Sequence, residues 1–254
     1  MNNAVPVNST TRAVGSVMRR ELSGYFATPV AWVFIVIFLV MAGVFTFYIG
    51  SFYERGIADL APYFQFHPWL YLFLVPAIAM RLWAEERRSG TVELLLTLPV
   101  TTWQAVVGKF LAAWLFIGIA LGLTFPIWLT VNYLGEPDNG VILAGYIGSW
   151  LMAGGFLAIG SCMSAVTRNQ VVAFILSVVV CFGFLLSGLP MVMNLFSGWA
   201  PQVLLDLIAD FSFISRFGSI SKGVLDLRDL TYFALVIVFW LIANTVVLDL
   251  RKAD

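Results

Sequence analysis

Long, uncharged apolar runs dominate the sequence, and most of the charges lie in the short stretches between them. Hydrocarbon offers no hydrogen-bond partner for backbone groups, so a segment that crosses a membrane must be helical and about 20 residues long. The chain is 61% hydrophobic and 11% charged, whereas a soluble domain averages about 45–50% apolar and about 25% charged. These features predict an all-α, polytopic membrane protein rather than a soluble domain.

The positions of the apolar runs predict six transmembrane helices. The second run is the shortest and is interrupted by Pro76, while Lys109 near the start of the third predicts that this helix begins in the cytoplasm. The predicted spans are residues 29–50, 66–83, 102–133, 141–166, 171–195 and 230–250. Residues 1–11 are expected to form a disordered tail, and residues 12–254 a single transmembrane domain.

Lys and Arg are divided unevenly between the two sides that six crossings would create. Cytoplasmic loops of membrane proteins carry an excess of these residues. The side with the excess also holds both termini, which predicts an orientation with both ends of the chain in the cytoplasm. This side would hold Arg12, Arg19, Arg20, Arg81, Arg87, Arg88, Lys109, Arg168, Arg251 and Lys252, leaving Arg55, Arg216, Lys222 and Arg228 outside.

The charged residues before the first span form part of an amphipathic pattern. Over residues 12–27, apolar residues such as Val14, Val17 and Leu22 recur at helical spacing, and Arg residues occupy the opposite side. This pattern predicts a helix at the membrane interface, with its apolar face in the acyl region and its arginines near the phosphates. The alternative interpretation is a charge cluster that only sets the topology.

Residues 84–101 predict a helix–break–helix element on the cytoplasmic side. A charged cluster precedes Gly90, a leucine-rich helix follows, and Pro99 ends it. Thr101 with Gln104 fits a capping box that opens the third span. Apolar residues exposed beside charges usually mark a partner site. The alternative is a helix that lies on lipid headgroups.

The stretch before the last span, residues 198–226, is half apolar although it should lie outside. Its helical pieces are too short and too charged to cross a membrane. We therefore expect a pair of short helices in the outer leaflet, broken near Gly218 and Gly223.

The usual sequence signatures of catalysis and metal binding are missing. Gly108-Lys109 lacks the upstream glycine and the following Ser or Thr that a phosphate-binding P-loop needs. His67 is the only histidine and cannot make a zinc site alone. Ser161 and Ser164 have no histidine near them in sequence, so they are interpreted as small residues that let helices approach closely. We predict no catalytic, cofactor or metal site, and the balanced charge predicts no nucleic-acid partner.

The three non-spanning stretches, in this order, resemble those of the ABC-2 type (type V exporter) permeases. The similarity is greatest to the gliding-motility-type (GldF-like) subfamily, a relative of the nitrous-oxide-maturation permeases. EERRSGTVELLLTLPVTTWQAVVGKF (residues 85–110) is similar to the cytoplasmic signature of the family. FSFISRFGSISKGVLDLRDLTYF (residues 211–233) is similar to the family's stretch before the last span.

The resemblance implies roles for the three stretches. Residues 12–27 would be the elbow helix, with Arg12, Arg19, Arg20 and Glu21. Residues 198–226 would be re-entrant helices, with the neighbouring Asp229 and with Phe213, Phe217, Gly223 and Asp226. Residues 84–101 would be the coupling region that contacts the ATPase subunit, through Glu85, Glu86, Arg87, Arg88, Gly90, Thr91, Glu93, Leu94, Leu95 and Pro99.

The function that the resemblance implies is that of a permease subunit in an ATP-binding cassette exporter of the bacterial cytoplasmic (inner) membrane. ATP and Mg would bind a separate cytoplasmic ATPase, with no cofactor on this chain. A second permease subunit, identical or related, would complete the transporter, and an extracytoplasmic partner remains open. The aromatic and aliphatic spans suit an amphipathic or lipid-linked substrate. The alternative function is a non-transporting membrane anchor or mechanical coupler that recruits an ATPase to a cell-envelope machine.

Overall fold

The computed structural model describes residues 7–90, 100–189, 192–194, 201–202 and 208–251, and every regular element in these ranges is a helix. The first described element is α1 (Val7–Ala27). This helix starts before Arg12, so the segment expected to be a disordered tail is helical from Val7 onwards. Residues 1–6 lie outside the described part.

The first predicted span is formed by α2 (Pro29–Gly43) and a continuing π-helical turn, η1 (Val44–Ile49). A short helix, α3 (Ala61–Gln65), then leads into α4 (His67–Ala79). Pro76 lies inside α4 and does not interrupt it; the break comes at Met80, before α5 (Arg81–Ser89). The second predicted span is therefore two helices, and α5 extends beyond its expected end at residue 83.

The third predicted span also consists of two helices, α7 (Thr102–Gly122) and α8 (Phe125–Leu134). The break precedes Pro126, because proline is favoured in the first turn of a new helix. The predicted capping box is confirmed: the Thr101 hydroxyl accepts a hydrogen bond from the Gln104 backbone, and the Gln104 side chain accepts one from the Thr101 backbone. It sets the start of α7.

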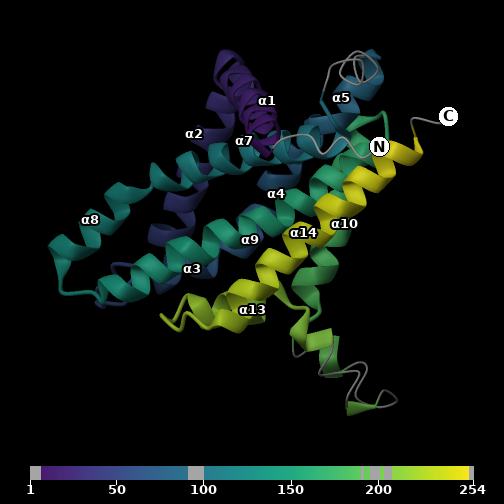
Figure 1. Cartoon of the computed structure of the whole chain (residues 1–254). Coiled ribbons are helices and arrows are strands. Elements are labelled where there is room, and N and C mark those ends of the chain that lie inside the picture. Colours follow the sequence, from purple (N-terminus) through teal and green to yellow (C-terminus); the bar gives the residue numbers. More distant parts are fainter. Residues whose placement is uncertain (1–6, 91–99, 190–191, 195–200, 203–207, 252–254) are drawn as a thin grey trace.

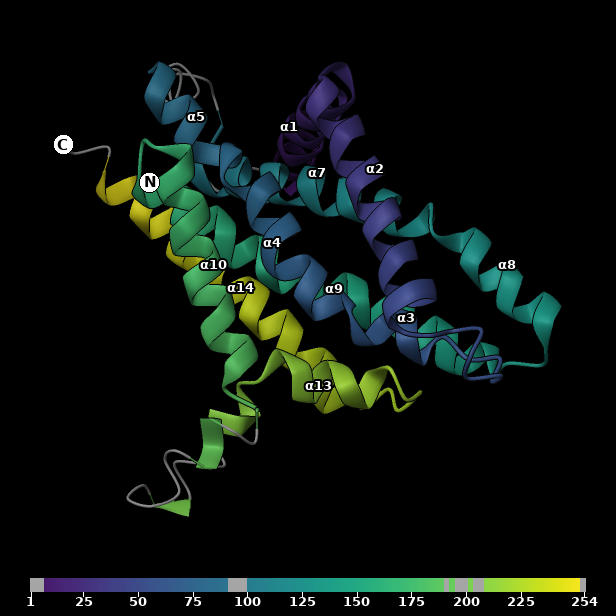
Figure 2. The same cartoon turned by 180° about the vertical axis from the view of Figure 1, so that it is seen from behind.

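The central helix of the fold is α9 (Asn139–Val166), which contacts α4, α5, α7, α10, α13 and α14. Its partners α10 (Gln170–Leu186) and α14 (Leu227–Leu250) pack along it (Figures 1 and 2). Glycines on α9 also let α4 and α7 approach it closely. A Cβ placed on Gly160 would lie 2.5 Å from the Cβ of Ala79 on α4, and one on Gly154 would lie 2.8 Å from the Trp114 indole nitrogen on α7.

Four stretches of helix are long and apolar enough to cross a membrane: Pro29–Ile49, Thr102–Leu134, Asn139–Val166 and Leu227–Leu250. The fifth predicted span corresponds to α10, which is apolar but has only 17 residues. Part of its predicted continuation, at 190–191 and 195, lies outside the described residues. Six spans and the cytoplasmic location of both termini therefore remain predictions.

The two ends of the helical bundle carry different elements (Figure 1). At one end lie α1, α5 and the end of α14; the hydroxyl of Thr102 donates to the Asp249 carboxylate across 2.7 Å and joins the start of α7 to this group. At the other end lie α3 and α13 (Phe213–Ile220). We refer to these as the α5 end and the α13 end.

Candidate functional site

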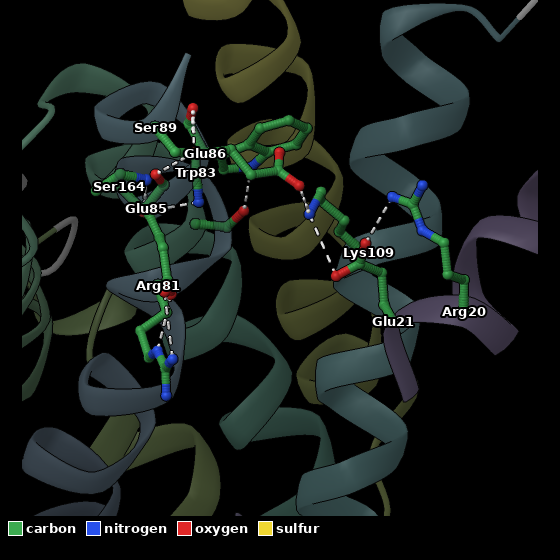
Figure 3. Close-up of polar contacts among 11 residues, drawn as sticks. Arg20, Glu21, Arg81, Trp83, Glu85, Glu86, Ser89, Lys109 and Ser164 are labelled. Atoms are coloured by element: carbon green, nitrogen blue, oxygen red, sulfur yellow. Dashed lines mark hydrogen bonds and ion pairs between the residues drawn. The ribbon is translucent and has the colours of Figure 1, made fainter. Parts of the chain in front are cut away.

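A buried lysine at the α5 end joins three helices. The side chain of Lys109 on α7 is only 3% exposed, and its ammonium group lies 2.8 Å from a Glu86 carboxylate oxygen on α5 and 3.2 Å from a Glu21 oxygen on α1. It also lies 5.2 Å from the ring centre of Trp83. Figure 3 shows the lysine between the two carboxylates. We call Glu21, Glu86 and Lys109 the ionic cluster.

The residue before this lysine explains how α1 comes close enough. Gly108 faces α1, and a Cβ at this position would lie 2.7 Å from the Val17 side chain and 3.2 Å from the Val14 carbonyl oxygen. Only glycine permits this crossing without displacing α1. The Gly108-Lys109 pair therefore brings α1 against α7 and then supplies the positive charge that Glu21 needs.

The carboxyl group of Glu21 responds to this environment. Burial raises its pKa, but the positive charge of Lys109 and hydrogen bonds from Arg20 and Lys109 act in the opposite direction and prevail. The net result is a pKa below the usual value of 4.5, so the carboxylate is ionised at neutral pH. The Arg20 guanidinium lies 2.9 Å from the other Glu21 oxygen. In the contact of α1 with α7, the Glu21 carboxylate thus lies between two positive charges, Arg20 on its own helix and Lys109 on α7.

Polar contacts with α9 fix the position of α5. At the α4–α5 break, the Ser164 hydroxyl accepts hydrogen bonds from the backbone N–H groups of Trp83 (3.1 Å) and Ala84 (3.0 Å), and donates to the Met80 carbonyl (2.8 Å). The Trp83 indole donates to Ser161, which also accepts from Asn244 on α14. These two serines therefore bind α5 in addition to allowing close packing.

The charged residues of α5 divide into inward-facing and outward-facing sets. Glu86 points to Lys109, and Arg87 donates a hydrogen bond to the Ala165 carbonyl of α9. Glu85 has a half-exposed side chain that pairs with Arg81 on the same helix at 3.0 Å, and Arg88 is exposed. Gly90 ends the helix in the left-handed conformation, with φ of 74°. The predicted contact residues Thr91, Glu93, Leu94, Leu95 and Pro99 lie outside the described residues.

Three of the four predicted elbow residues are exposed to solvent, and the fourth points inward. Arg12, Arg19 and Arg20 are exposed on α1, whereas Glu21 turns inward to the ionic cluster. Sequence reasoning did not place Lys109, Trp83, Ser164 or Asn244 in a site. An ionisable side chain or an amide within an apolar helix is the signal that could have identified Lys109 and Asn244.

A cavity of about 430 Å³ adjoins the ionic cluster. Its walls come from α1, α2, α4, α5 and α7, and most of its lining is apolar. Val30, Val33 and Ile37 of α2 line it and are between 44% and 55% exposed, so the cavity opens along the outer face of α2. At its polar end are Glu21, Arg81, Glu85, Glu86 and Lys109. This arrangement fits a molecule with a hydrocarbon part and a charged part.

The predicted residues at the α13 end are brought together. Phe213 and Phe217 are buried, and Arg216 on the same helix forms ion pairs with Asp210 (2.6 Å) and with the buried Asp229 (3.0 Å). Asp226 caps α14 through the Arg228 backbone, and Gly223 adopts φ of 88°. The chain turns at Gly223 as predicted, but the break expected at Gly218 is wrong.

Gly218 lies inside α13 because the apolar face formed by Phe213, Phe217 and Ile220 continues through it and packs on α9. The structure describes only part of the predicted pair of short helices over residues 198–226. Residues 198–200 and 203–207 lie outside the described part, and α13 is the described helix of that pair.

The sequence profile of one protein family, described as ABC-2 family transporter protein, matches residues 16–248. The match runs from α1 to the last turn of α14, so it includes the ionic cluster, the cavity and the α13 end. The chain belongs to this family of membrane transport components, and it is a multi-pass membrane protein with several apolar helices. A search among curated proteins found no match to the chain.

Proposed function

We propose that the chain is the permease subunit of an ATP-binding cassette exporter in a bacterial cytoplasmic membrane. Family membership supports a permease, and the quoted residues 85–110 and 211–233 favour the gliding-motility-type subfamily. In this proposal the chain crosses the membrane six times, with α4 and part of α5 as the second crossing and α10 as the fifth. Both termini and α5 face the cytoplasm.

The observation that carries the proposal is the linkage between α5 and three other helices. An ATPase subunit that moved the exposed end of α5 would act directly on α7 and α1, because Glu86 shares the ammonium group of Lys109 with Glu21. It would also act on α9, through Ser164 and Arg87. ATP and Mg would bind to that ATPase, and a second permease subunit, identical or related, would complete the transporter.

The ATPase contact is tested with exposed arginines at the same end of the molecule. We expect Arg88→Glu on α5 to reduce co-purification of a P-loop ATPase with the tagged permease at least tenfold, since one charge reversal costs more than about 1.4 kcal/mol at a complementary interface. Arg19→Glu on α1 makes the same change outside the contact and should retain the ATPase. Equal retention by both variants would contradict the coupling role of α5. Glu86→Lys is unsuitable because it would place two ammonium groups in the ionic cluster.

The cavity supports an amphipathic or lipid-linked substrate. Ala77 of α4 lines it and Phe73, one turn earlier, is 55% exposed outside it. Ala77→Trp should abolish transport-coupled stimulation of the ATPase by membrane extract, while Phe73→Trp should leave it intact. The alternative function, a non-transporting anchor or coupler, needs the α5 contact but no cavity. It predicts normal cellular function in the Ala77→Trp variant.

A further inference from the structure

Three arginines from different elements converge at the α5 end. Arg87 lies on α5, Arg168 lies in the turn between α9 and α10, and Arg251 caps α14. The Arg87 guanidinium is fixed beside the last turn of α9 by its hydrogen bond to the Ala165 carbonyl. Burial lowers the pKa of Arg87, and the positive charges of Arg251 and Arg168 lower it further. Arg87 therefore lies within electrostatic reach of both other arginines, and its contact with Ala165 places it three residues from Arg168 along the chain.

No carboxylate in the described part of the chain forms an ion pair with these three arginines. Among the described residues, Arg81, Lys109 and Arg216 each form an ion pair, but Arg87, Arg168 and Arg251 form none. Glu86, next to Arg87, is directed to Lys109, and Asp249, two residues before Arg251, accepts from Thr102 on α7. A guanidinium has five N–H donors in a planar arrangement that matches carboxylate and phosphate oxygens.

The position of the three arginines indicates what kind of anion would bind. α9 ends at Val166, α10 begins at Gln170 and α14 ends at Leu250, so Arg168 and Arg251 lie where the apolar helices stop. Directly beside them, Val171 on α10 is 64% exposed and Leu250 on α14 is 68% exposed. Exposed apolar side chains next to these cations match the layout of a lipid: the apolar side chains would face its acyl chains and the arginines its phosphate.

We infer that Arg87, Arg168 and Arg251 form a binding site for the phosphate group of an anionic phospholipid. The acyl chains would lie against the apolar faces of α10 and α14, and Arg87 would form the floor of the site. Such a lipid would bridge α5, the α9–α10 turn and α14, and so would hold α5 against the bundle. The inference does not depend on the cargo or on the ATPase.

The test uses the purified full chain in nanodiscs of phosphatidylcholine with a minor fraction of phosphatidylglycerol. Native mass spectrometry counts the phosphatidylglycerol molecules that remain bound. The double variant Arg168→Gln/Arg251→Gln removes two exposed arginines and leaves Arg87 and the packing in place. We expect retention to fall roughly tenfold to thirtyfold, because each basic residue near an anionic lipid surface contributes about 1 kcal/mol.

The control is Arg12→Gln/Arg19→Gln, which removes the same charge from exposed positions on α1 and should retain the lipid. Equal losses in the two double variants would show general electrostatic attraction and overturn the site. Equal retention of phosphatidylglycerol and phosphatidylcholine by the unmodified chain would also overturn it. So would loss of a co-purifying ATPase without loss of lipid, because the arginines would then bind protein. Competition by millimolar inorganic phosphate would assign the site to free phosphate rather than lipid.

Discussion

The contacts of Lys109 explain how a charged side chain is tolerated within an apolar helix. An ammonium group in an apolar helix is costly unless it is paired, and removing one partner of a buried pair leaves the other charge uncompensated. Here Gly108 lets α1 approach, Glu21 comes from α1 and Glu86 from α5. One charge therefore joins three helices, α1, α5 and α7.

Lys109→Met should destabilise the protein through the two carboxylates that it leaves behind. Their side chains are each 21% exposed, so the expected loss is near the lower end of the buried-pair range, about 3 kcal/mol. Thermal unfolding in detergent would measure it. The triple variant Glu21→Gln/Glu86→Gln/Lys109→Met removes all three charges and should recover much of the loss. If Lys109→Met is as stable as the unmodified chain, the ionic cluster contributes no net stability.

The same cluster predicts acid sensitivity of the contact of α1 with α7. The folded-state pKa of Glu21 lies below its usual value of 4.5, so its contribution to stability is complete above that value and is lost as the pH falls through the folded pKa. Hydrogen exchange at the α1 amides should therefore accelerate below about pH 4.5, relative to the intrinsic rate. Glu21→Gln should remove most of this pH dependence. An unchanged profile in that variant would assign the effect to other groups.

At the scale of helices, sequence patterns predicted the helix ends and turns that neighbouring residues specify. They missed the features that depend on contacts between distant parts of the chain. The capping box at Thr101 and the turn at Gly223 were correct because a few neighbouring residues specify them. Pro76 misled the prediction because contacts of α4 with α9 hold the helix together through it. The break at Met80 depends on a hydroxyl of Ser164, 84 residues further along the chain, and no local pattern could reveal it.

The central position of α9 predicts which glycine cannot be replaced. Gly160→Leu would place a side chain where α4 already lies, because the new Cβ would be 2.5 Å from the Cβ of Ala79. Overpacking of this kind costs about 1–3 kcal/mol or more, and the yield of monodisperse protein in size-exclusion chromatography should fall. Gly183→Leu on α10 is the matched control, because a Cβ there meets nothing within 4 Å. Comparable yields from both variants would argue against close packing of α4 on α9.

For the whole molecule, the distribution of charge agrees with the arrangement of the helices. The elements at the α5 end carry the arginines of α1, α5, the α9–α10 turn and the C-terminal cap of α14, whereas the α13 end carries Arg216 on α13 and the neighbouring Arg228, both paired with Asp210 (Figure 1). The excess of basic residues that marks the cytoplasmic face thus gathers at one end of the bundle. In the proposed orientation, that end is cytoplasmic.

Cysteine labelling tests this orientation directly. Cys162 and Cys181 are buried, so Cys162→Ala/Cys181→Ala provides a background with no other thiol. In this background, Arg88→Cys on α5 and Lys222→Cys after α13 place single thiols at opposite ends, at exposed positions. A membrane-impermeant maleimide applied to spheroplasts should label Lys222→Cys and leave Arg88→Cys unlabelled until the membrane is opened, because the maleimide cannot cross hydrocarbon. Labelling of Arg88→Cys in sealed spheroplasts would place α5 outside, where no ATP-driven subunit could reach it, and the proposed exporter would have to be abandoned.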